Sequence, residues 1–215
     1  MSVSITVLTV GAFQENCYLL MEPGGSRCAI IDPGAEPERI IAAVERSGAA
    51  PEAIWLTHAH LDHVGAISGL RRRWDIPVYL HPLDGPLYAM ASRQAALYGL
   101  PFEQPDPPDR ALGDGDVLEL AGVRMTVMHA PGHAPGHVVF HGHGIALVGD
   151  CLFAGSIGRT DLPMSNPRDL AASLDRIVAL PDDTVVYPGH GPVTTIGTEM
   201  ASNPFLTGAA RIVGA

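Results

Sequence analysis

Cysteine is scarce in this sequence of 215 residues. The three that occur, Cys17, Cys28 and Cys151, form an odd set with no repeated spacing. A disulfide framework is therefore not expected, and a reducing cytoplasm is the expected location. Long apolar runs are also absent, since none approaches the roughly 20 residues that a membrane helix needs. The first eleven residues alternate as in a strand and do not resemble a signal peptide, so we expect no membrane partner.

Basic residues are few as well. Thirteen Lys and Arg stand against 23 Asp and Glu, which gives a formal net charge of −10. Because an acidic surface repels a phosphate backbone, we expect no nucleic-acid partner. Hydrophobic residues make up 47% of the sequence, and a chain of this length buries roughly 70% of its unfolded surface. We therefore expect one domain, residues 1–215.

The first half of the sequence alternates β-prone runs with helical patterns. Its apolar spacing predicts strands at 4–10, 16–21, 28–31, 53–57 and 77–80, and helices at 36–46, 64–73 and 86–98. Residues 101–115 carry four prolines and several acidic residues, which is typical of a surface crossing without an element of its own.

The second half repeats this order of elements. Its pattern predicts strands at 117–120, 123–128, 137–140, 145–148 and 184–187, and a helix at 167–179. Because each half supplies several strands followed by helices, the pattern predicts an α/β fold in which two sheets pack face to face with helices outside.

Four residues with ligand chemistry follow the strand predicted at 53–57: His58, His60, Asp62 and His63. In an extended segment His58 and His60 point to the same side, so that two imidazoles can reach one ion. Asp62 and His63 lie at the following turn and can reach a second ion. This short loop therefore predicts half of a two-metal site.

Three further residues occupy similar places later in the sequence. His133 lies in a glycine- and proline-rich loop at 131–136, Asp150 ends an apolar run, and His190 follows the strand predicted at 184–187. Together with the first cluster they provide five imidazoles and two carboxylates. This set suffices for two ions with Asp150 bridging them and open positions left for solvent.

Residues 58–65 resemble the H-x-H-x-D-H-x-G signature of the metallo-β-lactamase superfamily, and the later His, Asp and His match its remaining ligand positions. The pattern is similar to that of glyoxalase II (hydroxyacylglutathione hydrolase). Flavodiiron members carry Glu where His60 stands, and the zinc β-lactamases carry Cys where Asp150 stands. The resemblance implies a four-layer αββα sandwich of two mixed sheets. It also implies a first metal held by His58, His60 and His133, a second held by Asp62, His63 and His190, and a shared Asp150.

The likeness extends beyond the ligands. Residues 150–161, 195–199 and 203–206 are similar to single-domain glyoxalase II-like proteins, so that the resemblance covers nearly the whole chain. Two-domain glyoxalase II enzymes add a C-terminal helical extension that helps to hold glutathione, whereas this sequence ends at Ala215 without one. The resemblance therefore implies the reaction more firmly than the thiol carrier of the substrate.

By this resemblance the expected function is hydrolysis of a thioester such as S-lactoylglutathione, with an ester or lactone less favoured. Two divalent ions, zinc by expectation with iron or manganese also compatible, would lower the pKa of a bridging water from about 15.7 toward about 7. The resulting hydroxide would attack the carbonyl carbon. Asp150, as the bridge, and Asp62, as the only obvious proton acceptor, are the candidate catalytic residues.

Three other functions stay open at this point. A mononuclear iron dioxygenase acting on glutathione persulfide would use His58, His133 and Asp150 as a facial triad. A non-catalytic metal-binding protein usually loses ligands, whereas all seven positions are filled here. Nuclease members usually add a substrate-clamping domain, for which an acidic chain of 215 residues has no room.

Residues near these ligands suggest smaller roles. Arg159 follows a glycine-rich loop, where it can bind a substrate carboxylate through two hydrogen bonds or pair with Asp161. Cys151 is expected to point away from the centre and to be structural. Residues 141–143, with two histidines, predict a surface hairpin in preference to a third metal site. The protein is expected to be a monomer or a small homo-oligomer, with Phe205 and Leu206 packed on a partner or on the core.

Overall fold

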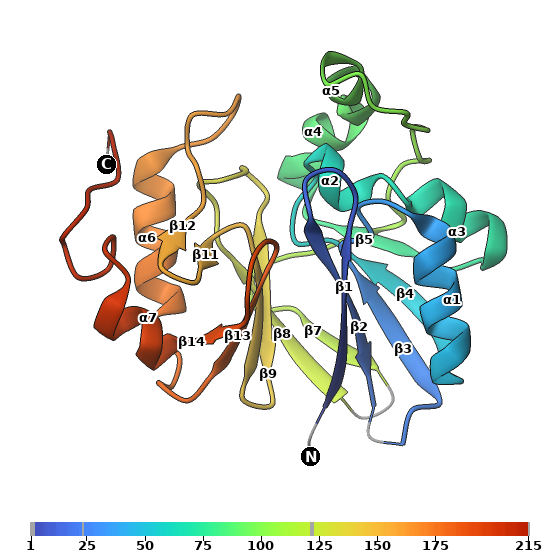
Figure 1. Ribbon diagram of the computed structural model, residues 1–215, viewed down its shortest axis with the longest axis horizontal. Coiled ribbons are helices and arrows are strands. Elements are labelled where there is room, and N and C mark those ends of the chain that lie inside the picture. Colours follow the sequence, from blue (N-terminus) through green and yellow to red (C-terminus); the bar gives the residue numbers. More distant parts are fainter. Residues whose placement is uncertain (1–2, 23, 121–122, 215) are drawn as a thin grey trace.

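Two six-stranded sheets lie face to face, with helices on both outer sides (Figure 1). The structure is a computed structural model that describes residues 3–22, 24–120 and 123–214. The strand order is β1-β2-β3-β4-β5-β6 in the first sheet and β14-β13-β10-β9-β8-β7 in the second. Both sheets combine parallel and antiparallel pairs. The predicted four-layer αββα sandwich of mixed sheets is therefore confirmed.

The first sheet begins as an antiparallel meander and continues with parallel strands. Its members are β1 (Ser4–Val10), β2 (Glu15–Met21), β3 (Arg27–Ile31), β4 (Ala50–Trp55), β5 (Val78–Leu80) and β6 (Arg110–Ala111). The parallel connections run through α1 (Pro37–Ser47), α2 (Leu61–Val64), α3 (Ile67–Arg73), the 3-10 turn Pro82–Asp84, α4 (Gly85–Ala89) and α5 (Ala91–Leu97). Helix α1 buries Ile40 and Val44 against the sheet and ends at Gly48, which has a positive φ of 73°.

The second sheet repeats the arrangement in the other half of the chain. Its strands are β7 (Val117–Leu120), β8 (Val123–His129), β9 (Val138–Gly142), β10 (Ile145–Gly149), β13 (Val185–Pro188) and β14 (Thr194–Thr195). A small hairpin of β11 (Leu152–Phe153) and β12 (Ser156–Ile157) precedes α6 (Pro167–Ile177), and α7 (Ile196–Ser202) follows β14. The side chain of Asn166 caps α6 by accepting from the backbone N–H groups of Arg168 and Asp169.

Several sequence predictions need correction. The crossing at 101–115 contains β6, which pairs with the edge of β5. Backbone hydrogen bonds at a sheet edge need no apolar periodicity, and a two-residue strand leaves no pattern to read. The helix predicted at 64–73 begins later, as α3, and the short helix α2 before it was not predicted; the helix predicted at 86–98 is divided into α4 and α5. The short elements β11, β12, β14 and α7 carried no signal that the sequence analysis detected.

Three apolar layers hold the sandwich together. Ile40, Ile54 and Leu70 lie between the first sheet and its helices. Leu20 and Phe140 lie in the layer between the two sheets. The third layer packs α6 on the second sheet, with the partly buried Leu206 against it. Burying one such large side chain stabilises the fold by about 1.5–3 kcal/mol. Among the described residues, no helix is long and apolar enough to cross a bilayer.

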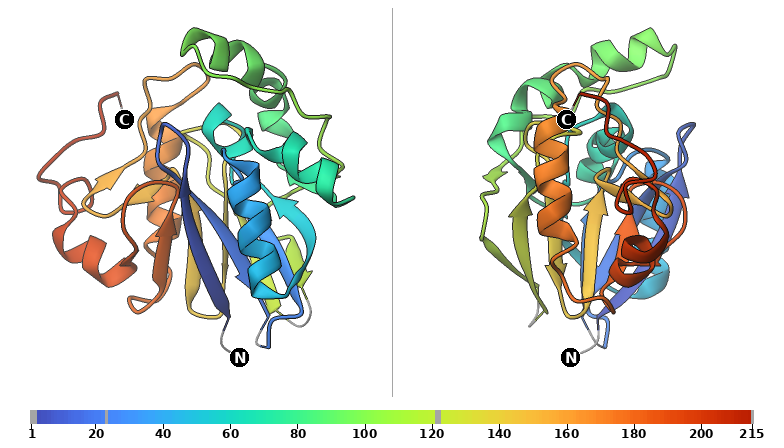
Figure 2. Two further views of the ribbon diagram at one scale, coloured as in Figure 1. Left: turned by 45° about the vertical axis from the view of Figure 1, so that its right-hand side comes forward. Right: turned by 90° about the vertical axis from the view of Figure 1, so that its left-hand side faces the viewer.

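Except for His133, which lies between the antiparallel strands β8 and β9, the predicted ligand residues follow the carboxyl ends of parallel strands. Strand β3 pairs in parallel with β4 in the first sheet, and β10 pairs in parallel with β13 in the second. Loops that leave this edge of both sheets approach one another, as ligand-bearing loops do in open α/β sheets. Figure 2 shows α4 and α5 standing above this end of the molecule.

Candidate metal centre

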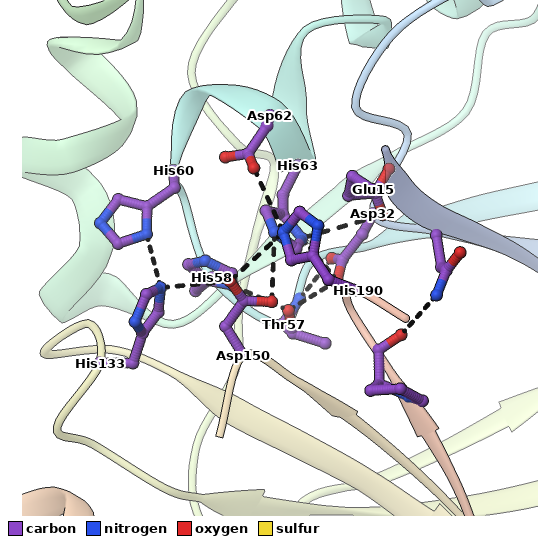
Figure 3. A network of polar contacts seen from close by, with 12 residues as sticks. Glu15, Asp32, Thr57, His58, His60, Asp62, His63, His133, Asp150 and His190 are labelled. Atoms are coloured by element: carbon purple, nitrogen blue, oxygen red, sulfur yellow. Dashed lines mark hydrogen bonds and ion pairs between the residues drawn. The ribbon is translucent and has the colours of Figure 1, made fainter. Parts of the chain in front are cut away.

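The structure brings together all seven residues that the sequence predicted as ligands (Figure 3). His58 and His60 lie in the extended loop after β4, and α2 carries the next two ligand residues. The remaining ligands come from the loop between β8 and β9 and from the residues that follow β10 and β13. Segments up to 132 positions apart in the sequence thus meet at one centre. Its residues are His58, His60, Asp62, His63, His133, Asp150 and His190.

The side chains form two groups. In the first trio, His58, His60 and His133, one ring nitrogen of each lies within 4.8 Å of the others. In the second trio, Asp62, His63 and His190, the ligand atoms lie within the same distance. The closest pairs are 2.9 Å between His60 Nδ1 and His133 Nε2, and 3.4 Å between Asp62 Oδ2 and His190 Nε2. Each trio is compact enough to surround one ion.

Asp150 lies between the two trios. Its Oδ2 is 3.5 Å from Nε2 of both His133 and His190, and its Oδ1 is 3.6 Å from Nε2 of His63. The neighbouring backbone must come very close, because a Cβ on Gly189 would lie 2.1 Å from Asp150 Oδ1. Only glycine fits at that position. One carboxylate therefore faces both groups.

Backbone carbonyls fix the tautomers of two imidazoles. Nδ1 of His133 lies 2.9 Å from the carbonyl oxygen of Arg159, and Nδ1 of His190 lies 3.1 Å from that of Phe13. Because a carbonyl oxygen only accepts, each Nδ1 must carry the proton and donate it. The Nε2 lone pairs then face the centre, as a hydrogen bond from the other ring nitrogen usually arranges in metal-binding histidines.

Asp32 and Thr57 orient two further imidazoles. The hydroxyl of Thr57 donates to Asp32 Oδ2 at 2.6 Å, so it can only accept from His58 Nδ1, which lies 3.0 Å away. Nδ1 of His63 donates to the same Asp32 oxygen at 3.1 Å. Both rings thus present Nε2 to the centre. Asp32 is not among the ligands predicted from the sequence; its place directly after β3 was the available signal.

Unpartnered polar atoms make this centre a candidate cation site. His58 Nε2, His63 Nε2 and Asp150 Oδ1 are buried and have no hydrogen-bond partner among the described residues. Leaving a buried polar atom unpaired costs about 1–3 kcal/mol. A bound cation would satisfy these lone pairs, so the donor set fits divalent metal ions.

The two trios differ in electrostatics. Burial lowers the pKa of His58 well below its usual value and that of His60 to about 3. Burial has the same tendency at His63, but Asp150 and Asp62 raise its pKa to about 9. Hydrogen bonds to Asp150 and Asp62 likewise overcome burial at His190 and raise its pKa to about 10. The second trio therefore lies in the more negative field.

Asp84 connects the loops that carry the first trio. This carboxylate is fully buried and accepts from the N–H of Ala59 at 2.9 Å and from the N–H of Gly136. Ala59 stands between His58 and His60, and Gly136 closes the loop of His133. No motif marked Asp84 in the sequence, because its partners are backbone groups of two distant loops.

A pocket of about 460 Å³ opens above the centre. His60, Asp62, His133, Asp150 and His190 lie at its floor. Its walls are mostly apolar, and they come from the β1–β2 loop, the segment from α4 to Tyr98, and the chain around β11 and β12. The centre is thus accessible to a small molecule, as an active site requires.

Residues 10–190 match the family model described as the metallo-beta-lactamase superfamily. The chain belongs to this superfamily. It is 40% identical over 208 residues to "Hydroxyacylglutathione hydrolase GloC" of Haemophilus influenzae, covering 94% of this chain and 98% of that protein.

Two crystal structures are also similar to this metallo-β-lactamase superfamily member. That of TTHA1623 in a di-iron-bound form has a TM-score of 0.87 and 48% identity, and the match covers 94% of this chain and all of that one. That of the BLEG-1 B3 metallo-beta-lactamase has a TM-score of 0.89 and 38% identity, and the match covers 95% of this chain and all of that one.

Two residues beside the candidate metal centre make different contacts. Arg159 lines the pocket, but Nε and Nη2 of its guanidinium each donate to Asp161 at 2.6 Å. Of the two roles weighed from the sequence, the structure contains the ion pair. Cys151 is fully buried, with Sγ 3.4 Å from the carbonyl of Ala130 and 3.4 Å from Nδ1 of His137. It points into the core, as expected.

The other histidines do not gather into a third group. Residues 141–143 lie at the turn between β9 and β10, where His143 is exposed, so the predicted surface hairpin is confirmed. His81 stacks on His129 at 4.3 Å between ring centroids, away from the centre. His137 is buried behind Asp150, whose backbone N–H donates to its Nε2.

Proposed function

We propose that this protein is a hydrolase of thioesters such as S-lactoylglutathione and works with two divalent metal ions. The observation that carries the proposal is the pair of ligand trios facing one shared carboxylate at the floor of an open pocket. In this proposal the first trio would hold one ion and the second trio the other, and Asp150, which faces both trios, would serve as a shared ligand. The relative named hydroxyacylglutathione hydrolase supports the reaction, and the di-iron-bound structure supports two ions.

The metal is proposed to be zinc, although His and Asp ligands also accept iron or manganese. When bound, the ions would polarise the thioester carbonyl and lower the pKa of water at the site. In hydrolysis the oxygen of water bonds to the carbonyl carbon, and the carbon–sulfur bond breaks with its electron pair leaving on sulfur. The water proton passes to a nearby base, for which Asp62 and Asp150 are the candidates, and the products are an acid and a thiol. Because a thiolate leaves readily, no dedicated acid is required.

The chain's own contribution is to hold its donors in place. The carbonyls of Phe13 and Arg159, together with Asp32 and Thr57, keep four imidazoles in the tautomer that turns Nε2 inward. The apolar walls limit the water around the reacting carbonyl, which strengthens electrostatic interactions there. We also propose a cytoplasmic location, with which three buried free cysteines agree.

The test measures bound metal and thioester cleavage together. Purified protein is analysed for metal content and assayed for thiol release from S-lactoylglutathione, beside His58→Ala and Asp150→Ala. His141→Ala and Asp183→Ala, which change the same residue types outside the centre, serve as controls. We expect two ions in the wild type and loss of turnover in the two site variants only. Turnover that persists in metal-stripped site variants would refute the proposal.

The same preparation separates the other functions. One iron with oxygen uptake on glutathione persulfide would instead support the dioxygenase. Hydrolysis of a β-lactam in preference to a thioester would support the activity named for the BLEG-1 relative. Two ions with neither activity and no thioester cleavage would leave a non-catalytic metal-binding protein.

A further inference from the structure

Apolar side chains form most of the pocket wall above the centre. Phe13 comes from the β1–β2 loop, and Leu87, Leu97 and Tyr98 come from the segment that begins with α4. The opposite wall holds Phe153, Ile157, Leu162 and Pro163. Three segments far apart in sequence thus present an apolar surface to whatever occupies the pocket.

Much of this wall is exposed. Leu97 is 82% exposed, Tyr98 is 58% exposed and Phe13 is 38% exposed. The rings of Phe13 and Tyr98 meet edge to face with centroids 5.3 Å apart, so the mouth of the pocket has an ordered aromatic edge. A group of large apolar side chains left in water beside a site usually marks a surface that a ligand covers.

The charged groups in the pocket also favour an apolar ligand. The guanidinium of Arg159 is the one lysine or arginine group among the lining residues, and its Nε and Nη2 already donate to Asp161. The other ionisable groups at the floor belong to the trios and Asp150. Glutathione has two carboxylates and one ammonium group and is polar along its length. The pocket lining offers these carboxylates one guanidinium, which already pairs with Asp161, so the apolar walls are better matched by an apolar acyl group than by the carrier.

We propose that the pocket selects thioesters with an apolar acyl group, aryl or branched alkyl, over short polar acyl groups such as lactoyl. This inference depends on the proposed thioester hydrolysis for its kinetic form. The preference itself is a property of the wall and can be measured without turnover.

The kinetic test compares S-mandeloylglutathione with S-lactoylglutathione on the metal-loaded protein. The two substrates share the carrier and the α-hydroxyl group and differ by phenyl in place of methyl. We expect kcat/KM to be at least about tenfold higher for the mandeloyl substrate, because the phenyl ring buries apolar area that the methyl group does not. A ratio of one or less would overturn the inference.

Variants locate the source of the preference. In the double variant Leu97→Ser/Tyr98→Ser the ratio of the two kcat/KM values should fall by about tenfold. The matched control is Val213→Ser/Leu83→Ser, whose side chains are 88% and 53% exposed and do not line the pocket. The control should keep the wild-type ratio. A ratio that survives in the wall variant would also overturn the inference.

A binding measurement separates this inference from the proposed function. S-benzylglutathione and S-methylglutathione are thioethers that cannot be hydrolysed, and calorimetry on the metal-loaded protein gives their dissociation constants. We expect the benzyl compound to bind about tenfold more tightly, and the wall variant to lose the difference. If this holds while neither thioester is cleaved, the proposed reaction is wrong and the apolar preference stands. Equal affinities would reject the preference whatever the turnover.

Discussion

The first trio is three buried imidazoles, whereas the second contains a carboxylate and has further carboxylates beside it. Nδ1 of His63 lies 3.1 Å from Asp32 and 3.9 Å from Glu15, and Asp62 faces His190. Burial, reinforced by the other carboxylates, raises the pKa of Glu15 well above its usual value. The first trio thus offers neutral nitrogen ligands, and the second offers a negative field.

The supports of the two trios differ as well. Asp84 acts on the first trio through backbone N–H groups, so it sets where the loops lie. Asp32 acts on the second trio through the ring of His63 itself. One centre thus combines a trio held by loop position with a trio held by charge, and each can be disturbed separately.

The shared ligand should give the largest effect. Asp150→Ala removes the group that faces both trios and should lower kcat/KM by about 10³-fold or more, since metal charge at the carbonyl contributes several kcal/mol. Metal analysis should show both ions reduced. His190→Ala, in contrast, should reduce the second ion while leaving the first. Loss of a single ion in Asp150→Ala would show that the carboxylate is not shared.

The pH dependence of metal binding should differ between the trios. His63 and His190, with pKa values raised to about 9 and about 10, carry protons at neutral pH that an incoming ion must displace. Affinity for the second ion should therefore fall as pH decreases below 9, by up to about tenfold per pH unit for each proton displaced. His60, with its pKa lowered to about 3, holds no such proton. Competition with a chelator from pH 6 to 9 tests this, and equal slopes for both ions would contradict it.

Asp32→Asn should weaken binding of the second ion more than binding of the first. The amide no longer offers His63 Nδ1 the same carboxylate acceptor, and changes of this kind typically cost 10–100-fold in metal affinity. Zinc titration of the variant against Asp183→Asn provides the measurement. An unchanged second site would mean that Asp32 does not support the second trio.

Asp84→Asn should selectively weaken binding of the first ion. In the variant, an amide N–H replaces one of the carboxylate oxygens and faces a backbone N–H. This mismatch costs about 1–3 kcal/mol. If the cost displaces the loops of the first trio, affinity for the first ion should fall by about tenfold. Cobalt spectra resolve the two sites during titration. If binding of both ions weakens equally, Asp84 supports the whole fold and not the first trio in particular.

Cys151→Ala should have the smallest effect on the centre, although it adjoins the shared ligand. Its buried thiol, with a pKa raised well above its usual value, faces His137 and the carbonyl of Ala130. We expect kcat/KM within about twofold of the wild type and a stability loss of about 1–2 kcal/mol from the cavity. Thermal unfolding and the thioester assay measure both. A large loss of activity at unchanged stability would assign the thiol a chemical role.

Much of the architecture could be predicted because apolar patterns mark buried strands directly. The strands at 4–10 and 117–120 were placed within their observed bounds, since their runs end at turn residues. The pattern failed at β6 and at the division of α4 from α5, where backbone pairing and local turns decide the structure.

Residue types and their spacing identify the side chains with metal-binding chemistry, because closely spaced histidines and aspartates directly after strands are informative without any contact. How these side chains are held depends on the folded chain. The carbonyl of Phe13 orients His190 from 177 positions away, and Asp84 meets Gly136 across 52. Such partners are backbone groups that every residue possesses, so their roles arise from the positions that folding gives them and leave no mark in residue type.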